Sequence, residues 1–205
     1  PNDVARLRID TPGVDGQVFL NSAGSSLPPR TVLEAQVAHL AEEASKGGYR
    51  AAQDAAERLE AARVSVATHV GAPAPTVAMV GSATEAWRLA LNGFSLQAGD
   101  VVVTARAAFG SNAIAMLQRA EQKGAQFEVA PDDAQGCVCL DWLEQRLKRG
   151  GVRLVCLTHV PTGEGIVNPA EAVGALTRAA GVPYLLDACQ SVGQRVLDWD
   201  TLQCD

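Results

Sequence analysis

The chain has 205 residues, a formal net charge of −6 and 47% hydrophobic residues, enough for one sizeable hydrophobic core. Its charges form neither a basic block nor an acidic tail, no apolar run reaches the roughly 18 residues of a membrane span, and the first residues lack the layout of a signal peptide. Nucleic acid and membrane are therefore poor candidates for partners, and the five cysteines, an odd number, suit reduced thiols in a cytoplasmic globular protein better than disulfides.

The N-terminal third divides into an arm and two helices. Glycine and proline punctuate residues 1–30, which predicts an irregular arm with one strand-like piece at 18–20. Helical periodicity then runs over 33–44 and 52–66, on either side of the pair Gly47–Gly48. We expect residues 1–30 to be an N-terminal arm and 31–205 to be one large domain.

From residue 76 onward, strands and helices alternate. The expected strands are 76–80, 101–104, 126–130, 152–159 and 182–186, and the expected helices lie near 84–97, 112–123, 141–149 and 169–180. This alternation predicts an α/β fold with a three-layer, mainly parallel sheet, preceded by the irregular arm and two helices. Ser82 with Glu85 and Asp141 with Glu144 have capping-box spacing, and Asn168 is expected to cap the last helix.

Candidate ligand-binding residues follow two of the expected strands. Asp187 ends the last apolar run, with the amide Gln190 three residues later. A carboxylate there lies where open α/β sheets bind ligands, although an acid capping a following helix is an equal alternative. Ala83 and Thr84 open a helix directly after the first strand, which suits a phosphate or ordinary capping.

An aromatic ring and a histidine complete this edge. Phe109 lies in the loop after the second strand, where it either faces a flat ring or packs beneath its loop. His159 ends the fourth strand and is expected to be a hydrogen-bonded structural group. A phosphate pocket, a stacking surface and a carboxylate are what a phosphorylated pyridine needs, so the expected ligand is pyridoxal phosphate. No Gly-x-Gly-x-x-Gly or Gly-Lys-Ser/Thr motif indicates a nucleotide, and the Cys137–Cys139 spacing indicates no metal site.

Four stretches resemble one enzyme family. They are Phe19–Gly24, Gly81–Ala86, Thr158–Val160 and Asp187–Gly193. They are similar to the class V aminotransferase group of fold-type I enzymes, which use pyridoxal 5′-phosphate and include cysteine desulfurases, selenocysteine lyases and related C–S lyases. The resemblance implies a lyase or aminotransferase that acts on an amino acid, usually as a homodimer.

The resemblance also implies roles for individual residues. Ala83 and Thr84 would hold the phosphate, Asp187 would face the pyridine nitrogen and Gln190 the phenolic oxygen. Phe109 stands where cysteine desulfurases have a histidine stacked on the cofactor, and Phe cannot move protons. Thr162 stands where many relatives have an asparagine.

The catalytic lysine is expected beyond Asp205. Family members bind the cofactor as a Schiff base on a lysine a few tens of residues after the Asp-x-x-Gln stretch, followed by a small C-terminal domain. Lys46, Lys123 and Lys148 are the only lysines, and all three fit solvated positions. We therefore expect an incomplete large domain with no catalytic residue of its own. The alternatives are a non-catalytic binding or assembly module of the same fold, and an unrelated α/β domain that binds another phosphorylated ligand.

Overall fold

The computed structural model describes residues 3–205. Contacts divide the chain into two compact units, Pro1–Val64 and Ser65–Asp205, which are described separately. The division expected at residue 30, between an arm and one large domain, stays a prediction.

The first unit is helical. It holds α1 (Val4–Ile9), the short 3₁₀ helix η1 (Pro12–Val14), α2 (Arg30–Lys46) and the first part of α3 (Gly48–Val70). The two helices expected after the arm are confirmed, and Gly47 ends α2 with a φ of 81°, a conformation that glycine adopts without a steric penalty. The strand-like piece at 18–20 is not a strand, because no neighbouring strand pairs with it within the described residues.

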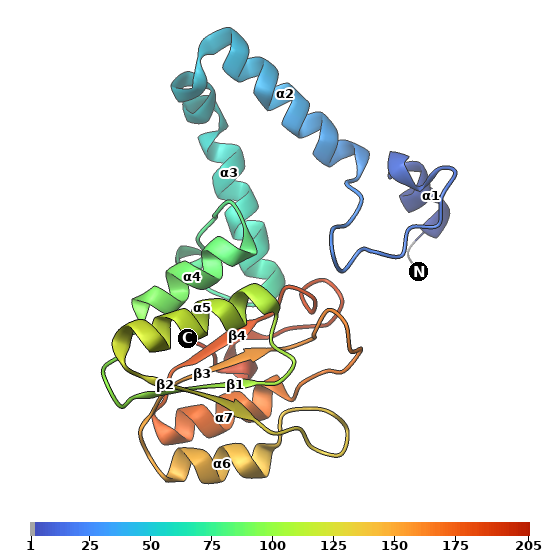
Figure 1. The fold of residues 1–205 in the computed structure, drawn as a ribbon. Coiled ribbons are helices and arrows are strands. Elements are labelled where there is room, and N and C mark those ends of the chain that lie inside the picture. The colour runs from blue at the N-terminus through green and yellow to red at the C-terminus, as the bar shows by residue number, and fades with distance from the viewer. Residues whose placement is uncertain (1–2) are drawn as a thin grey trace. The chain divides into compact units, whose positions relative to one another are not determined.

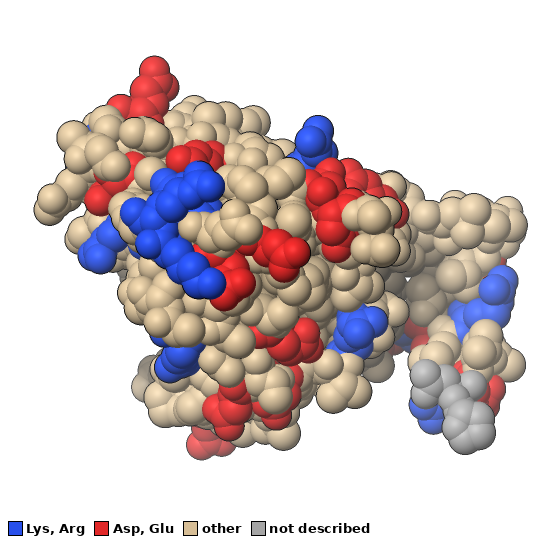
Figure 2. Space-filling view, turned by 90° about the horizontal axis from the view of Figure 1, so that it is seen from below, with Lys and Arg blue, Asp and Glu red and all other residues tan. Residues whose placement is uncertain are grey.

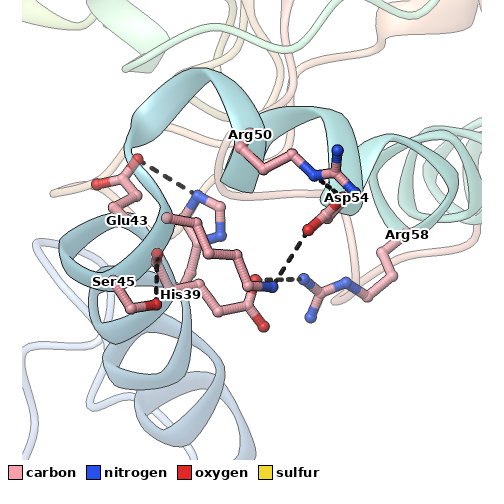
Figure 3. A network of polar contacts seen from close by, with 8 residues as sticks. His39, Glu43, Ser45, Arg50, Asp54 and Arg58 are labelled. Atoms are coloured by element: carbon pink, nitrogen blue, oxygen red, sulfur yellow. Dashed lines mark hydrogen bonds and ion pairs between the residues drawn. The ribbon is translucent and has the colours of Figure 1, made fainter.

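Ion pairs hold the turn between α2 and α3 (Figure 3). Lys46 Nζ lies 3.1 Å and Arg50 Nε 3.0 Å from the carboxylate of Asp54, and Arg58 approaches Glu42 at 3.6 Å. The hydrogen bond from Lys46 lowers the pKa of the Asp54 carboxyl. These groups are exposed, so each pair stabilises the turn only modestly.

The second unit contains a four-stranded parallel sheet. Its strands are β1 (Val101–Ala105), β2 (Gln126–Ala130), β3 (Val152–Thr158) and β4 (Tyr184–Asp187), in the order β2-β1-β3-β4. The helices are α4 (Ala83–Gly93), α5 (Gly110–Lys123), α6 (Leu140–Lys148), α7 (Ala170–Ala180) and α8 (Trp199–Leu202), with η2 at Ala74–Thr76. α4 and α5 cover one face of the sheet, and α6 and α7 cover the other (Figure 1). The predicted three-layer α/β fold is confirmed.

Alternate strand residues supply the two halves of the core. Val102, Cys156 and Leu185 pack with residues of α4 and α5, while Val103 and Tyr184 pack with residues of α6 and α7. Side chains along a strand point alternately to the two faces. With both faces covered, the inner strands β1 and β3 are buried along nearly their whole length, which is why they could be recognised from the sequence. The edge strand β2 is only partly buried, and its polar and apolar residues alternate at 126–129.

The expected strand at 76–80 is wrong. This segment begins with the end of η2, and Val77 has the extended backbone angles φ −91° and ψ 122°. Met79 and Val80 are exposed, and 77–80 pairs with no strand within the described residues. An extended apolar segment becomes a strand only where a neighbour accepts its backbone hydrogen bonds, and local sequence cannot reveal that neighbour.

The expected cap at Ser82 is confirmed, with its reciprocal bond shifted to the residue before the N-cap, and the other expected capping box is wrong. Ser82 Oγ accepts a hydrogen bond from the amide of Glu85 at 3.2 Å, and the Glu85 carboxylate accepts one from the amide of Gly81 at 3.0 Å. Asp141 instead lies inside the first turn of α6, whose N-cap is Cys139 without a side-chain cap. There its negative charge still interacts favourably with the positive end of the helix dipole.

Replacing Gly174 with Ala is expected to lower the free energy of unfolding by about 1–3 kcal/mol, which corresponds to several degrees in Tm. A Cβ at Gly174 would lie 2.1 Å from the backbone oxygen of Leu202, so α7 and α8 would have to separate. Thermal unfolding of the variant tests this. The matched control is Gly93→Ala in α4, where a Cβ meets nothing within 4 Å and stability should not fall; an equal loss in both variants would contradict the packing explanation.

Charged side chains of both signs lie next to one another on the face drawn in Figure 2, so that face carries no extended field of one sign. Among the described residues, no helix has both the length and the apolar character needed to cross a membrane.

Candidate active site

Parallel strands bring the expected site residues to one edge of the sheet. β3 and β4 pair in register, so that Thr158, which ends β3, lies beside Asp187, which ends β4. The amide of His159 donates to the backbone oxygen of Asp187 at 2.9 Å. The carboxyl ends of such strands form the usual ligand-binding edge of an open α/β sheet.

Asp187 presents a buried carboxylate at this edge. Its exposed fraction is 9%. Oδ2 accepts a hydrogen bond from Asn112 Nδ2 at 2.7 Å, and Oδ1 accepts one from the amide of Cys189 at 3.0 Å. Asp187 does not cap a helix, because the chain continues in turns and the next helix begins at Trp199. The alternative of a simple helix cap is therefore wrong.

Phe109 lies beside the end of β3, the strand that pairs with the Asp187 strand β4. Its amide donates to Thr158 Oγ1 at 3.4 Å, and Phe109 is the N-cap residue of α5. The residue is 48% exposed, so it is not packed beneath its loop. Its ring is available to contact a planar ligand at the edge of the sheet.

Two helix starts meet at the same edge. Thr84 Oγ1 lies 3.2 Å from Ser111 Oγ, which joins the first turn of α4 to the first turn of α5. Ser82 already caps the amide of Glu85. The preceding amides, of Ala83 and Thr84, have no acceptor within their own helix. Such amides, at the positive end of a helix dipole, suit a phosphate group.

The structure thus brings together most of the expected residues. Thr84 reaches α5 through Ser111, Phe109 reaches β3 through Thr158, and Asp187 reaches α5 through its bond with Asn112. Ala83 adjoins Thr84, and Gln190 lies half-buried in the turn three residues after Asp187. Their roles toward a ligand stay predictions.

Ser111 and Asn112 were not among the residues predicted for the site. Both occupy the first turn of α5, directly after Phe109, so their place in the sequence after β1 already indicated this edge of the sheet. Their residue types gave no further signal, because Ser and Asn are common at the start of any helix.

Asn168 and His159 lie behind the site. Asn168 is not a helix cap: its side chain accepts from the amide of Val138 at 2.9 Å and donates to the Thr158 oxygen at 2.8 Å. His159 is 2% exposed, and its Nδ1 has no hydrogen-bond partner among the described residues. Burial lowers the pKa of His159. The expected hydrogen-bonded side chain is therefore not what the structure shows at Nδ1.

Within residues 3–205, neither the cysteines nor the acids are grouped as metal ligands. None of the five cysteines is in a disulfide, and the described residues contain no group of three or more His, Cys, Asp or Glu side chains that could hold a metal ion. Burial raises the pKa of the Cys156 thiol far above its usual range. Burial, a hydrogen bond with Asp187 and the charge of Asp187 together raise the pKa of Cys189 to about 11.

Known proteins resemble this chain along nearly its whole length. A family model described as aminotransferase class-V matches residues 18–205. A probable cysteine desulfurase of Pyrococcus abyssi is 28% identical over the whole chain and 51% of its own length, and one of Synechocystis is 31% identical over the whole chain and 52% of its own length. The chain spans about half the length of these relatives.

Solved structures share the fold. The cysteine desulfurase CsdA of Escherichia coli matches with a TM-score of 0.86 and 25% identity, over 98% of this chain and 52% of that one. A mutant of the cystine C–S lyase C-DES, with glycine covalently linked to its pyridoxal phosphate cofactor, matches with a TM-score of 0.86 and 23% identity, over 97% of this chain and 53% of that one.

Proposed function

The chain belongs to the class-V aminotransferase family, and on that premise we propose that it is the cofactor-binding part of a pyridoxal-phosphate-dependent enzyme that acts on an amino acid. The reaction is a lyase reaction, of the C–S-cleaving kind for which its desulfurase relatives are named, or an amino-group transfer. Membership of the family removes the alternative of an unrelated α/β domain.

The buried carboxylate of Asp187 is the observation that carries this proposal. It lies at the carboxyl edge of the sheet, with both oxygens already accepting hydrogen bonds from Asn112 and Cys189. A carboxylate has about four acceptor positions, so beside the bonds from Asn112 and from the amide and thiol of Cys189 one position remains for a further donor. A protonated ring nitrogen is such a donor, and a charge-assisted bond to it is among the stronger kinds.

The surrounding residues fit the remaining parts of the cofactor. The amides of Ala83 and Thr84 and the hydroxyl of Thr84 would bind the phosphate. Phe109 would lie against the ring, and Gln190 would donate to the phenolic oxygen. Bound pyridoxal phosphate supplies an electron sink for the bonds at the α-carbon of an amino acid. Asp187 supports that sink by holding the proton on the ring nitrogen.

Phe109 limits the chemistry that this part of the protein supplies. A phenyl ring can orient a flat ligand and exclude water from one of its faces, but it has no group that takes up or releases a proton. Proton transfer therefore falls to a group other than the one that contacts the ring. We propose that this separates the enzyme from desulfurases that use a stacked histidine.

We propose that none of the three lysines of the chain binds the cofactor covalently. Lys46 pairs with Asp54 in the first unit, and Lys148 pairs with Glu144 in α6. Lys123 is in the last turn of α5, and because the 14 residues of α5 start at the site edge, their helical rise of about 20 Å carries Lys123 to the opposite edge. We propose that the Schiff-base lysine and a small domain lie outside residues 1–205, and that this chain alone is inactive.

A binding and reduction experiment tests the proposal. Pyridoxal phosphate should bind the 205-residue chain weakly but saturably, in competition with inorganic phosphate, and the chain should turn over no amino acid. Borohydride treatment followed by peptide mapping should leave no pyridoxyl group on Lys46, Lys123 or Lys148. A pyridoxyl group at full occupancy on any of these lysines would contradict the assignment, and a complete protein that binds the cofactor without acting on any amino acid would indicate a non-catalytic binding module.

We also propose that the complete protein is a homodimer. Leu33, Val37 and Leu40 of α2 are exposed apolar side chains spaced along one helix, and an exposed apolar stripe of this kind favours association. Sedimentation of the complete protein as a monomer at high concentration would count against it.

A further inference from the structure

We infer that Asn112 is a positioning residue that holds the carboxylate of Asp187 in the orientation required by the ring nitrogen of the cofactor. This inference rests on the proposed function. Asn112 itself would not touch the reacting atoms; it would act through Asp187.

The geometry of the pair supports this role. Asn112 Nδ2 lies 2.7 Å from Asp187 Oδ2, a short distance for an N–H donor. Both residues are buried, with 5% of Asn112 and 9% of Asp187 exposed. An amide nitrogen can only donate, so Oδ2 acts as the acceptor. In so buried a place the loss of this donor would leave a carboxylate oxygen poorly satisfied.

Two donors on two sides fix the plane of the carboxylate. Asn112 reaches Oδ2 from α5, while the amide of Cys189 reaches Oδ1 from the turn after β4. Without Asn112, the bond from the Cys189 amide alone would resist rotation of the carboxyl group about its bond to Cβ. A ring nitrogen would then meet an oxygen that is no longer held in place.

One helical turn links this carboxylate to the stacking surface. The amide of Asn112 donates to the backbone oxygen of Phe109 at 2.9 Å. The residue that contacts Asp187 and the residue that faces the ring plane therefore belong to the same turn at the start of α5. A shift of that turn would move both together.

Asn168 shows what a purely structural asparagine does in the same unit. It is as deeply buried, and its side chain joins two backbone groups, the amide of Val138 and the oxygen of Thr158. Asn112 instead donates a hydrogen bond from its side-chain amide to an ionisable side chain at the ligand-binding edge. Asn168 therefore serves as a matched control.

The test compares pyridoxal phosphate with its deaza analogue, in which carbon replaces the ring nitrogen. Both have the same phosphate and a ring of the same shape. The ratio used here, the Kd of the analogue divided by the Kd of pyridoxal phosphate, therefore isolates the bond to Asp187. In Asn112→Ala the Kd for pyridoxal phosphate should rise about tenfold, which is the loss of one good hydrogen bond. The Kd for the analogue should change less than about twofold.

Further variants separate positioning from folding. Asn112→His keeps an N–H donor at the same number of bonds from the backbone and should restore most of the ratio. In Asp187→Asn the ratio should fall by itself, and adding Asn112→Ala should lower it no further, as expected of residues that act as a unit. Asn168→Ala should lower Tm and leave the ratio unchanged.

Several results would overturn the inference. If Asn112→Ala leaves the ratio of the two Kd values unchanged, Asn112 is structural. If Asn112→Ala does not fold, a folded Asn112→His that has lost the preference for pyridoxal phosphate leads to the same conclusion. Failure of the unmodified protein to bind either ligand would instead refute the proposed function, and the inference with it.

Discussion

Replacing Asp187 with Asn is expected to leave pyridoxal phosphate bound to the complete enzyme and to lower kcat by roughly ten- to a hundredfold, the equivalent of a charge-assisted hydrogen bond of about 1.5–3 kcal/mol. An amide has no negative charge with which to hold a proton on the ring nitrogen. The electron sink therefore weakens, while the contacts to the phosphate and to the face of the ring persist.

Steady-state kinetics with cofactor in excess measure this effect. The control is Asp132→Asn: Asp132 follows β2 at the same edge of the sheet, where its carboxylate forms an ion pair with Arg106 at 2.8 Å. Arg106 is exposed and Asp132 half-buried, and the loss of this pair should change kcat by less than about twofold. Unchanged kcat in Asp187→Asn, or equal losses in both variants, would contradict the role given to Asp187.

The thiol of Cys189 is expected to react with iodoacetamide about a hundred times more slowly in the folded chain than in the urea-unfolded chain at pH 8. The residue is exposed, which alone would favour fast reaction. However, burial of the sulfur, followed by its hydrogen bond with Asp187 and the negative charge there, raises the pKa of Cys189 from 9.0 to about 11. Only the thiolate attacks, so two pH units correspond to about a hundredfold less of the reactive form.

The pH dependence of the alkylation rate shows whether the pKa of Cys189 is raised. Because the thiolate form is disfavoured, the rate in the folded chain should keep rising about tenfold per pH unit beyond pH 9, where the unfolded chain levels off. Peptide mapping assigns the modified cysteine. Asp187→Asn should speed the reaction, since it removes the negative charge beside the thiol, and an unchanged rate in that variant would show that Asp187 does not influence the thiol. Equal rates in the folded and unfolded chains would contradict the raised pKa of Cys189 itself.

The inner strands β1 and β3 could be predicted because burial on both faces leaves a signature in the sequence, and the partly buried β2 because its polar and apolar residues alternate. The expected strand at 126–130 agrees with β2 at both ends, and those at 101–104 and 152–159 differ from β1 and β3 by one residue. Segment 76–80 has the same apolar character but lacks a strand partner within the described residues. Pairing is a property of the neighbour, so composition alone cannot distinguish the two cases.

The candidate site was partly predictable for a related reason. Parallel topology places residues that follow strands at one edge, so Asp187, Phe109 and Thr84 could be assigned to it from the order of elements alone. The polar partners of these residues could not. Asn112 and Asn168 are both asparagines near a helix start, but one contacts a carboxylate and the other joins two backbone segments. Only the packing of α5 and of the loop before α7 decides between these uses.

The most direct test of the central claim is a ¹H–¹⁵N NMR titration of the chain with pyridoxal phosphate. The claim is that the cofactor binds at the carboxyl edge of the sheet, between the starts of α4 and α5 and the turn after β4. The amide signals of Thr84, Phe109, Asn112 and Cys189 should shift together with one Kd, while those at the opposite edge, such as Asp100 and Gly181, should stay in place. Shifts confined to the opposite edge, or no saturable shift at any of the four amides, would contradict the account.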